Sequence, residues 1–314
     1  MSGIIGEVRA AGILTIAAAV AFALAGCGSA DRRPAATATS ALTSVPASSA
    51  SSSASSSAVS RSKAVPRPDH IVVAVPENRS YDEIVGRPEA PFLNSLEAAG
   101  AVFTQSYAVA HPSQPNYLAL FSGSTQGVTD DSCPRTFSTG NLGRSLLDAG
   151  HTFAGYSEDL PSAGYAGCSA TLYARKHNPW ADFGNLPASV NQPMSAFPLD
   201  FTALPTVSFV IPNLAHDLHD GTLAQADLWL HDHLGAYAAW APEHNSVLVI
   251  TNDEDDHSSN NRISTVIVGA HVVPGRYPQH IDHYALLRTL EDAYDLAPLG
   301  ASARARPITA IWSA

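Results

Sequence analysis

The chain has 314 residues, of which 45% are hydrophobic and 14% are charged, and its formal net charge is −11. Residues 67–314 hold 12 Lys and Arg against 26 Asp and Glu, because 5 basic and 2 acidic residues precede them. This acidic balance, without a basic stripe, excludes nucleic acid as a bulk electrostatic partner. An anionic substrate would therefore need local help, for instance from a metal ion.

Residues 1–26 are predicted to be a lipoprotein signal peptide. Arg9 precedes an apolar run over residues 11–26, which is short for a membrane-spanning helix. The run ends in "LAGCGS", which resembles a bacterial lipobox and implies cleavage before Cys27 and a lipid on its sulfur. An ordinary signal peptide with an incidental Cys27 is the alternative. We expect an exported protein, lipid-anchored to the outer face of the bacterial cytoplasmic membrane or cell envelope.

Residues 27–66 are predicted to be a disordered tether behind the lipidated cysteine. They are rich in Ser and Ala and lack apolar periodicity, so they cannot bury enough surface to offset the entropy of ordering. Residues 67–314 then form one domain of catalytic size, which we expect to be monomeric. Its two cysteines, Cys133 and Cys168, suggest a disulfide in an exported protein, and two buried free thiols are the alternative.

Strand-like and helical segments alternate along this domain. Apolar runs predict strands, and mixed segments closed by Gly predict helices. The strands are expected within 70–78, 101–110, 151–159, 206–213, 246–256 and 262–269, and the helices within 90–100, 114–123, 142–150, 222–241 and 282–296. This alternation predicts an α/β fold in three layers, with a mostly parallel central sheet and helices on both faces.

Polar side chains follow four of the predicted strands. They are Glu77 and Asn78, Glu158 and Asp159, the segment 213–220, and the segment 253–257. In open α/β sheets, ligands bind beyond the carboxyl ends of the strands. We therefore expect these side chains to meet at one edge of the sheet.

The run "TNDEDD" places four acids after the clearest strand. Carboxylates grouped in this way are ligands for a divalent cation, and Asp253 and Glu254 are nearest the strand. A solvated acidic loop is the alternative. Glu77 and Asn78 would complete the same metal site, although such residues also close Asx-type turns.

Two further polar clusters are candidates. In "HDLHD", Asp217 and His219 could hold a metal, or His219 could give a proton to a leaving group, while a helix-entry turn is the alternative. In "ARKHNPW", residues 175–177 suggest anion binding by His177 and its neighbours, or simply a charged loop. His283 precedes the last helix and is either a site residue or only a neighbour of the helix end.

Ser113 heads an apolar helical run and stands between Pro112 and Gln114, with Pro115 next. A helix cap is the simplest interpretation. The alternative is a nucleophile, because the free N–H groups of a helix start stabilise an alkoxide and a bound phosphoryl group. A neighbouring metal would lower the pKa of the hydroxyl further. Asn116, one turn on, could donate to a phosphoryl oxygen.

At these residues the sequence resembles the bacterial phosphoesterase family of acid phosphatases and phosphatidylcholine-type phospholipases C, within the alkaline phosphatase superfamily. Seven segments match in order over about residues 70–296, among them "HPSQPNYLALFSG", "KHNPW", "FVIPNLAHDLHDG" and "TNDEDD". The related sulfatases carry Arg four positions after the nucleophile, where this chain has Tyr117. A formylglycine sulfatase is therefore not expected.

The resemblance implies an alkaline-phosphatase-like fold, a divalent metal and a covalent phosphoseryl intermediate. Carried over by position, the nucleophile is Ser113. The implied metal ligands are Glu77, Asn78, Ser113, Asp253 and Glu254, and the implied substrate-binding residues are Asn116, His177, Asp217, His219 and His283.

The predicted function is hydrolysis of phosphate monoesters, with His219 as proton donor. The alternatives are a phospholipase C or other phosphodiesterase with the same centre, and a catalytically silent surface lipoprotein that binds a ligand.

Overall fold

The structure is a computed structural model that describes residues 65–313. A nine-stranded mixed sheet forms the centre of this part of the chain. The strand order is β11-β2-β10-β8-β1-β7-β3-β6, with β9 paired to β2. The expected signal peptide, Cys27 and nearly all of the tether lie outside the described residues. The strands are β1 (His70–Ala74), β2 (Ala101–Tyr107), β3 (Phe153–Ser157), β6 (Asn191–Pro193), β7 (Val207–Ile211), β8 (Ser246–Thr251), β9 (Arg262–Ile263), β10 (Thr265–Gly269) and β11 (Gly275–Asp282).

The sheet is mostly parallel, as predicted. β1 runs parallel to β7 and β8, β3 runs parallel to β6 and β7, and β11 runs parallel to β2. β10 is antiparallel to both β2 and β8. The segment 262–269, expected as one strand, is divided into β9 and β10, and both lie antiparallel to β2.

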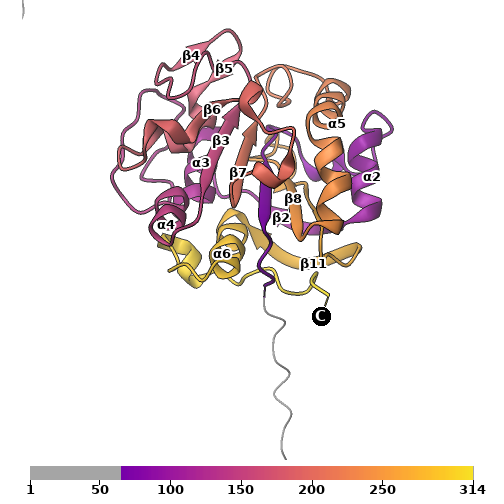
Figure 1. Cartoon of the computed structure of the whole chain (residues 1–314). Helices are drawn as coiled ribbons and strands as arrows, with labels where there is room; N and C mark the ends of the chain where they lie inside the picture. The colour runs from indigo at the N-terminus through magenta and orange to yellow at the C-terminus, as the bar shows by residue number, and fades with distance from the viewer. Residues whose placement is uncertain (1–64, 314) are drawn as a thin grey trace, which may run out of the picture. The chain divides into compact units, whose positions relative to one another are not determined.

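Helices cover both faces of the sheet (Figure 1). Along β1, Ile71 and Val73 belong to one apolar cluster, and Val72 and Ala74 belong to the other, as the two-residue period of a strand requires. The first cluster includes residues of α3 (Ser113–Ser122), α4 (Leu142–Asp148) and α6 (His283–Ala293), and the second includes residues of α1 (Tyr81–Ile84), α2 (Pro91–Ala99) and α5 (Leu223–Trp240). This confirms the three-layer α/β prediction.

Helix α3 is buried at every position from Ser113 to Ser122. It ends at Gly123, which has φ 69°, and a Cβ atom there would lie 2.0 Å from the carbonyl oxygen of Leu299. Only glycine combines this left-handed conformation with so close a backbone contact. The carboxyl end of α3 is therefore fixed against the C-terminal segment, and its amino end carries Ser113.

Strand β11 was not predicted, because its sequence "GRYPQHID" is polar and contains a proline. Prolines are tolerated in strands at sheet edges, and β11 is an edge strand, paired only with β2 in this sheet.

No helix among residues 65–313 is long and apolar enough to cross a membrane.

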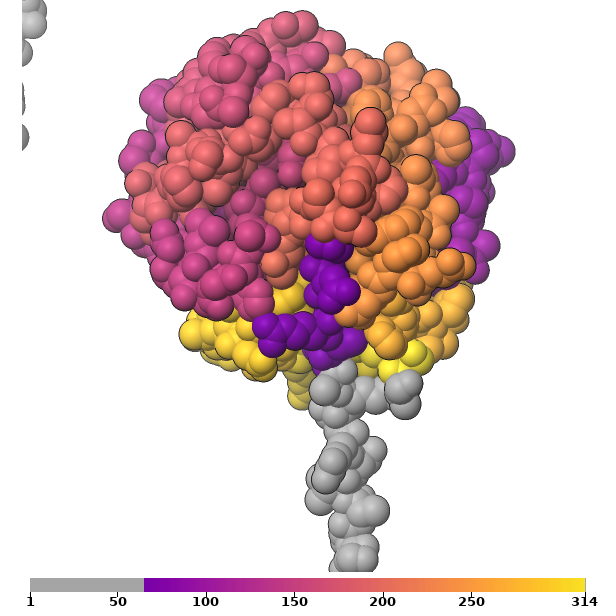
Figure 2. Space-filling view, viewed as in Figure 1, coloured from indigo at the N-terminus to yellow at the C-terminus, as the bar shows by residue number. Residues whose placement is uncertain are grey.

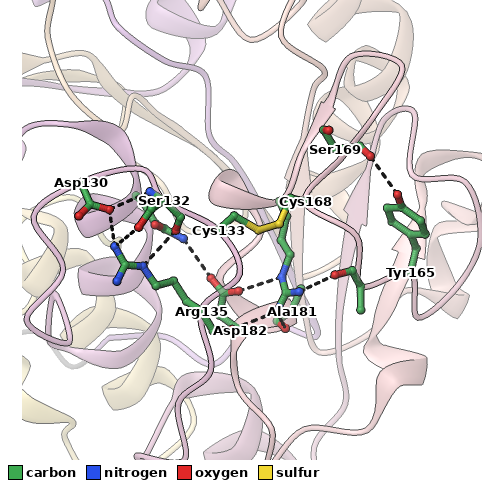
Figure 3. Close-up of a disulfide and its surroundings, with 12 residues drawn as sticks. Asp130, Ser132, Cys133, Arg135, Tyr165, Cys168, Ser169, Ala181 and Asp182 are labelled. Carbon is green, nitrogen blue, oxygen red and sulfur yellow. Dashed lines mark hydrogen bonds and ion pairs between the residues drawn. A yellow bond between two sulfur atoms is a disulfide. The ribbon is translucent and has the colours of Figure 1, made fainter. Parts of the chain in front are cut away.

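Two connections without long helices follow β3 in the chain, one from β3 to β6 and one from β6 to β7. The space-filling view in Figure 2 shows the segment around residues 190–205 (salmon) above the first described residues (indigo). The hairpin of β4 (Ser169–Ala170) and β5 (Tyr173–Ala174) belongs to the connection from β3 to β6 and leads into the short 3-10 helix η1 (Arg175–His177). A disulfide joins Cys133 to Cys168 and so ties the hairpin to the loop after α3, as predicted (Figure 3).

Candidate active site

Three buried side chains from different segments meet beyond the carboxyl end of β1. Glu77 follows β1, His177 ends η1, and Asp217 lies in the loop after β7. The Glu77 carboxylate contacts His177 Nε2, and His177 Nδ1 lies 3.2 Å from Asp217 Oδ2. One ligand atom from each residue lies within 4.8 Å of the other two. The group can therefore hold a metal ion, and it unites an expected metal ligand with two expected substrate-binding residues.

Charge holds this group together. Burial alone would lower the pKa of His177, but the Glu77 and Asp217 carboxylates outweigh it and raise that pKa to about 9. Burial and repulsion from Glu77 raise the pKa of Asp217. For Glu77 itself, burial opposes ionisation, yet the attraction of His177 lowers the pKa overall. The Tyr117 hydroxyl, one turn along α3 from Ser113, donates to Glu77 Oε1 at 3.2 Å.

Asn78 connects this group to the acidic run after β8. Its side-chain amide donates to Glu77 Oε2 at 3.3 Å, and its backbone N–H donates to Asp253 Oδ1 at 3.2 Å. The backbone of Asn78 adopts φ 51°, a conformation that asparagine tolerates better than most residues. The expected metal ligands Glu77, Asn78 and Asp253 thus lie next to one another.

One carboxylate oxygen of Asp253 is available to a cation. The side chain is buried, and its Oδ2 atom has no hydrogen-bond partner within the described residues. Burial, followed by repulsion from Glu77 and Glu254, raises its pKa well above the usual range for aspartate. A buried carboxylate oxygen without a donor is costly unless a cation binds it. The donor set of oxygen and imidazole atoms suits a divalent ion.

Ser113 faces the acidic run, and not only its own helix. Its hydroxyl donates to Glu254 Oε1 at 2.9 Å, and the other Glu254 oxygen contacts His111 Nδ1. His111 Nε2 lies 3.3 Å from Asp255 Oδ1, and the His111 ring stacks on His257 with 3.9 Å between centroids. The hydroxyl is not engaged in capping α3. The cap interpretation of Ser113 is therefore not supported.

His283 lies beneath the acidic run. Its Nε2 atom donates to the backbone carbonyl of Asp253 at 2.6 Å. Nε2 carries a proton because a carbonyl oxygen can only accept, and burial lowers the pKa of His283. His283 thus holds the backbone of Asp253, whereas the expected contact of its ring with substrate stays a prediction.

The Asn116 amide braces the chain before α3. Its Oδ1 accepts from the N–H groups of Val109 and Ala110, each at 3.0 Å. Its Nδ2 donates to the carbonyls of Ala110 and Pro112 at 2.9 and 3.3 Å. In this structure the amide is therefore occupied by backbone groups, and its expected bond to a phosphoryl oxygen stays a prediction.

Lys176, Asp131 and His219 form the rim of the site. The Lys176 ammonium donates to Asp131 Oδ2 at 2.9 Å and to His219 Nε2 at 3.3 Å. The other oxygen of Asp131 accepts from the backbone N–H of Gln114 at 2.9 Å. His219 Nδ1 lies 3.0 Å from Asp220 Oδ1, and Nε2 is the acceptor in the contact with Lys176 because an ammonium can only donate. The expected role of His219 as proton donor is not visible in this arrangement and stays a prediction.

Arg175 has a structural place beside the disulfide, in contrast to the expected anion binding. Its Nε atom donates to Asp182 Oδ1 at 2.9 Å, and its other nitrogens donate to the carbonyls of Ala166, Arg135 and Ala181. The side chain is 8% exposed. The guanidinium is therefore used to hold the loops around the site.

The expected meeting of strand ends is only partly observed. Glu158 pairs with His216 Nδ1 at 2.9 Å and accepts from the backbone N–H of Asn213 at 3.0 Å. These residues after β3 and β7 contact each other and are not in the Glu77 group.

Two residues near Ser113 were not predicted from the sequence, His111 and Asp131. His111 stands two residues before Ser113, but nothing local announces its contact with Glu254, which is 143 residues away.

Comparison with known proteins identifies the family. The model of the Phosphoesterase family matches residues 87–297. The phosphatidylinositol-3-phosphatase of Mycobacterium tuberculosis is 53% identical over 254 residues, which cover 80% of this chain and 85% of that protein. The phosphate-repressible acid phosphatase of Penicillium chrysogenum is 30% identical over 232 residues, which are 66% of this chain. The match covers 55% of the fungal protein, so this chain spans about half of its length.

Solved structures share the fold. A Vibrio parahaemolyticus protein of the alkaline phosphatase superfamily superposes with a TM-score of 0.53 at 14% identity, over 80% of this chain and 72% of that one. The phosphonate monoester hydrolase of Agrobacterium radiobacter gives 0.51 at 13% identity, over 77% and 78%. The chain thus belongs to the Phosphoesterase family, is a hydrolase of phosphoric esters, and has the fold of the alkaline phosphatase superfamily.

Proposed function

We propose that this chain is a metal-dependent phosphomonoesterase that works through a phosphoserine at Ser113. The observation that carries the proposal is the hydrogen bond from the Ser113 hydroxyl to Glu254 at the buried start of α3. A serine in this position can attack phosphorus while an adjacent carboxylate orients its hydroxyl. The positive end of the α3 dipole favours the negative charge of a phosphoryl group, and of the first-turn N–H groups the one on Gln114 is already bound to Asp131 while Pro115 has none.

The reaction is proposed to run in two in-line displacements. First, the Ser113 hydroxyl passes its proton to Glu254, Oγ forms a bond to phosphorus as the bond to the leaving alcohol breaks, and the alcohol oxygen takes up a proton. Second, water loses a proton and attacks phosphorus, the Ser113 Oγ–P bond breaks, Oγ takes back a proton, and inorganic phosphate leaves. Both steps place charge on the non-bridging oxygens of the phosphoryl group, so the groups that surround those oxygens determine the rate.

A divalent cation is proposed to be held by Glu77, Asn78, Asp253 and Glu254 with Ser113, and His177 and Asp217 adjoin Glu77 as further donors. Such an ion would lower the pKa of a bound hydroxyl and neutralise phosphoryl charge. The unpartnered Oδ2 of Asp253 supports this assignment. The identity of the metal is a matter for elemental analysis.

We propose a monoester substrate and take phosphatidylinositol 3-phosphate as the first candidate, from the name of the mycobacterial relative. Phospholipase C activity would instead release a phosphorylated headgroup. Product analysis separates the two: inorganic phosphate supports the monoesterase, and phosphocholine or another phosphorylated alcohol supports the phospholipase C.

The test is acid quench of the enzyme during turnover of a 32P-labelled monoester, followed by mapping of the labelled peptide. The wild type should carry label on Ser113, and Ser113→Ala should lose both label and activity. Ser122→Ala is the matched control, since Ser122 lies at the other end of α3 and donates to the Leu118 carbonyl. Retention of most metal-dependent activity by Ser113→Ala would refute the proposal.

Export and lipid attachment at Cys27 are proposed from the lipobox resemblance alone. The mature protein should partition into detergent with a diacylglycerol mass on Cys27, and Cys27→Ala should appear in the aqueous phase. We propose that the mature protein is a monomer, which light scattering of the Cys27→Ala form tests directly.

A further inference from the structure

We propose that Lys176 makes the enzyme prefer phosphate monoesters to diesters, by binding the extra anionic oxygen that only a monoester carries. This inference rests on the proposed function, since it concerns the substrate of the same site. Asp131 is proposed to position Lys176, and the Cys133–Cys168 disulfide is proposed to hold Asp131.

Two contacts place the Lys176 ammonium beside the start of α3 and near Glu77. It donates to Asp131 Oδ2 at 2.9 Å, and Asp131 Oδ1 accepts from the N–H of Gln114, the residue after Ser113. It also donates to His219 Nε2 at 3.3 Å. An ammonium has three donors, so two are used by these partners and one is left for a ligand.

After His177, Lys176 is the cation that attracts Glu77 most strongly. The Asp131 carboxylate contacts the ammonium directly, and the buried Glu77 and Asp253 carboxylates attract it. The neighbouring cation, Arg175, is bound to Asp182 and three backbone carbonyls. Lys176 is the only lysine in residues 65–313.

The charge of the substrate decides what Lys176 contributes. At neutral pH a phosphate monoester carries close to two negative charges on three non-bridging oxygens, because its second pKa is about 6. A diester carries one charge on two such oxygens. The carboxylates around Glu77 repel the more highly charged substrate, and an ammonium at the rim offsets this repulsion. Loss of the ammonium should therefore harm monoester hydrolysis more than diester hydrolysis.

Asp131 explains how a flexible lysine keeps its place. Its carboxylate joins the start of α3 to the Lys176 ammonium through its two oxygens. Asp131 lies two residues before Cys133, which forms a disulfide with Cys168. Cys168 directly precedes the β4–β5 hairpin, and this hairpin leads to Lys176. The two segments that carry Asp131 and Lys176 are thus cross-linked beside the site.

The experiment compares 4-nitrophenyl phosphate with bis(4-nitrophenyl) phosphate for Lys176→Met, Lys176→Arg and Asp131→Asn. Lys176→Met should lower kcat/KM for the monoester by about 10- to 100-fold, as expected for a lost charged hydrogen bond, and for the diester by less than about threefold. Lys176→Arg should recover part of the preference, and Asp131→Asn should lose part of it. Arg144→Met, which removes a surface cation paired with Asp148, should leave the ratio unchanged.

An equal fall for both esters, or no fall for either, overturns the proposal. If wild-type diester turnover is too slow to measure, inhibition constants for inorganic phosphate and dimethyl phosphate supply the same ratio. Failure of the phosphoserine mechanism is distinguished by Ser113→Ala, which tests the nucleophile and leaves Lys176 in place.

A second measurement does not depend on a Lys176 variant that folds. The chain has two lysines, Lys63 and Lys176, so Lys63→Arg leaves a single lysine signal in a chain labelled with 13Cε-lysine. Titration with inorganic phosphate should move this signal saturably, with the same dissociation constant that inhibition gives. A signal that does not move, or that moves without saturation, overturns the proposal.

Discussion

Glu254 bridges Ser113 and His111: one carboxylate oxygen accepts the Ser113 hydroxyl at 2.9 Å, and the other contacts His111 Nδ1. His111 is held in turn by Asp255 and by stacking on His257. The orientation of the proposed nucleophile therefore depends on a histidine that lies only two residues before it.

Replacing His111 should slow the reaction without weakening substrate binding. In His111→Phe the ring can still stack on His257, but both nitrogen contacts are lost and Glu254 can rotate away from Ser113. We expect kcat to fall by about tenfold, the effect of one charged hydrogen bond, with KM changed by less than about twofold. Steady-state kinetics checks this, with His257→Ala as the control for stacking alone. A change confined to KM would contradict the assignment.

Asn116 should matter for stability even before substrate binds. Asn116→Ala removes the partners of two partly buried N–H groups before α3 and leaves a cavity at a fully buried position, so we expect the free energy of unfolding to fall by about 2 to 4 kcal/mol. Urea denaturation measures this. Asn94→Ala, which removes one exposed bond to the Arg87 carbonyl, should cost less than about 1 kcal/mol. An equal loss in the free energy of unfolding for the two variants would show that Asn116 does not stabilise the segment before α3.

Metal removal should destabilise the fold as well as stop catalysis. Without a metal ion, Asp253 Oδ2 has no partner, and His177, Lys176 and His111 compensate only part of the repulsion among Glu77, Asp253 and Glu254. We expect a chelator to lower the Tm, because a ligand at a hundred times its Kd contributes about 2.7 kcal/mol. Asp253→Asn should show a smaller shift in the same calorimetric scan. A wild-type Tm that is indifferent to chelator would argue against the proposed metal site.

The pH dependence of stability should contain a component from Glu291 on α6, away from the site. Its oxygens accept from the Leu299 N–H and the Ser302 hydroxyl, and burial raises its pKa from 4.5 to about 7. A raised carboxyl pKa means that the folded state binds the proton more tightly. Its contribution is therefore complete below about pH 4.5 and is lost as the pH rises through about 7.

Glu291→Gln imitates the protonated form and should lack this component. Between pH 4.5 and pH 8, the wild type should lose up to about 3 kcal/mol more of its free energy of unfolding than Glu291→Gln does. Urea unfolding at several pH values gives both curves. Parallel curves would mean that Glu291 does not titrate in this range.

Loss of the disulfide should affect both stability and activity. It closes a loop of 35 residues, so Cys133→Ser with Cys168→Ser should cost about 3 to 4 kcal/mol on the loop-entropy model. Activity on monoesters should also fall, because Asp131 would no longer be held against Gln114 and Lys176. Reduced wild type should match the double variant in both measurements, and an unchanged monoester kcat/KM would separate the disulfide from the site.

The sequence predicted the parts of the site that follow from strand ends. Glu77 follows β1 and Asp253 follows β8, and these strands are neighbours, so the two acids had to lie close together. Ser113 was predictable as a helix start. Contacts between distant loops could not be predicted, because the local sequence around His111 or Asp131 does not indicate that they contact Glu254 and Lys176. Arg175 shows the same limit: a cation near a site was expected to bind anions, but it holds the loops together.

Complete burial of α3 restricts how this enzyme can change during evolution or design. One residue inserted into a helix turns everything beyond it by about 100° and moves it by about 1.5 Å. In α3 such a change would displace either Ser113 or the Gly123 contact with Leu299, since both ends are fixed. Length variation must therefore occur in the connections around the site, and substrate range is best altered there, in the loops that the disulfide joins.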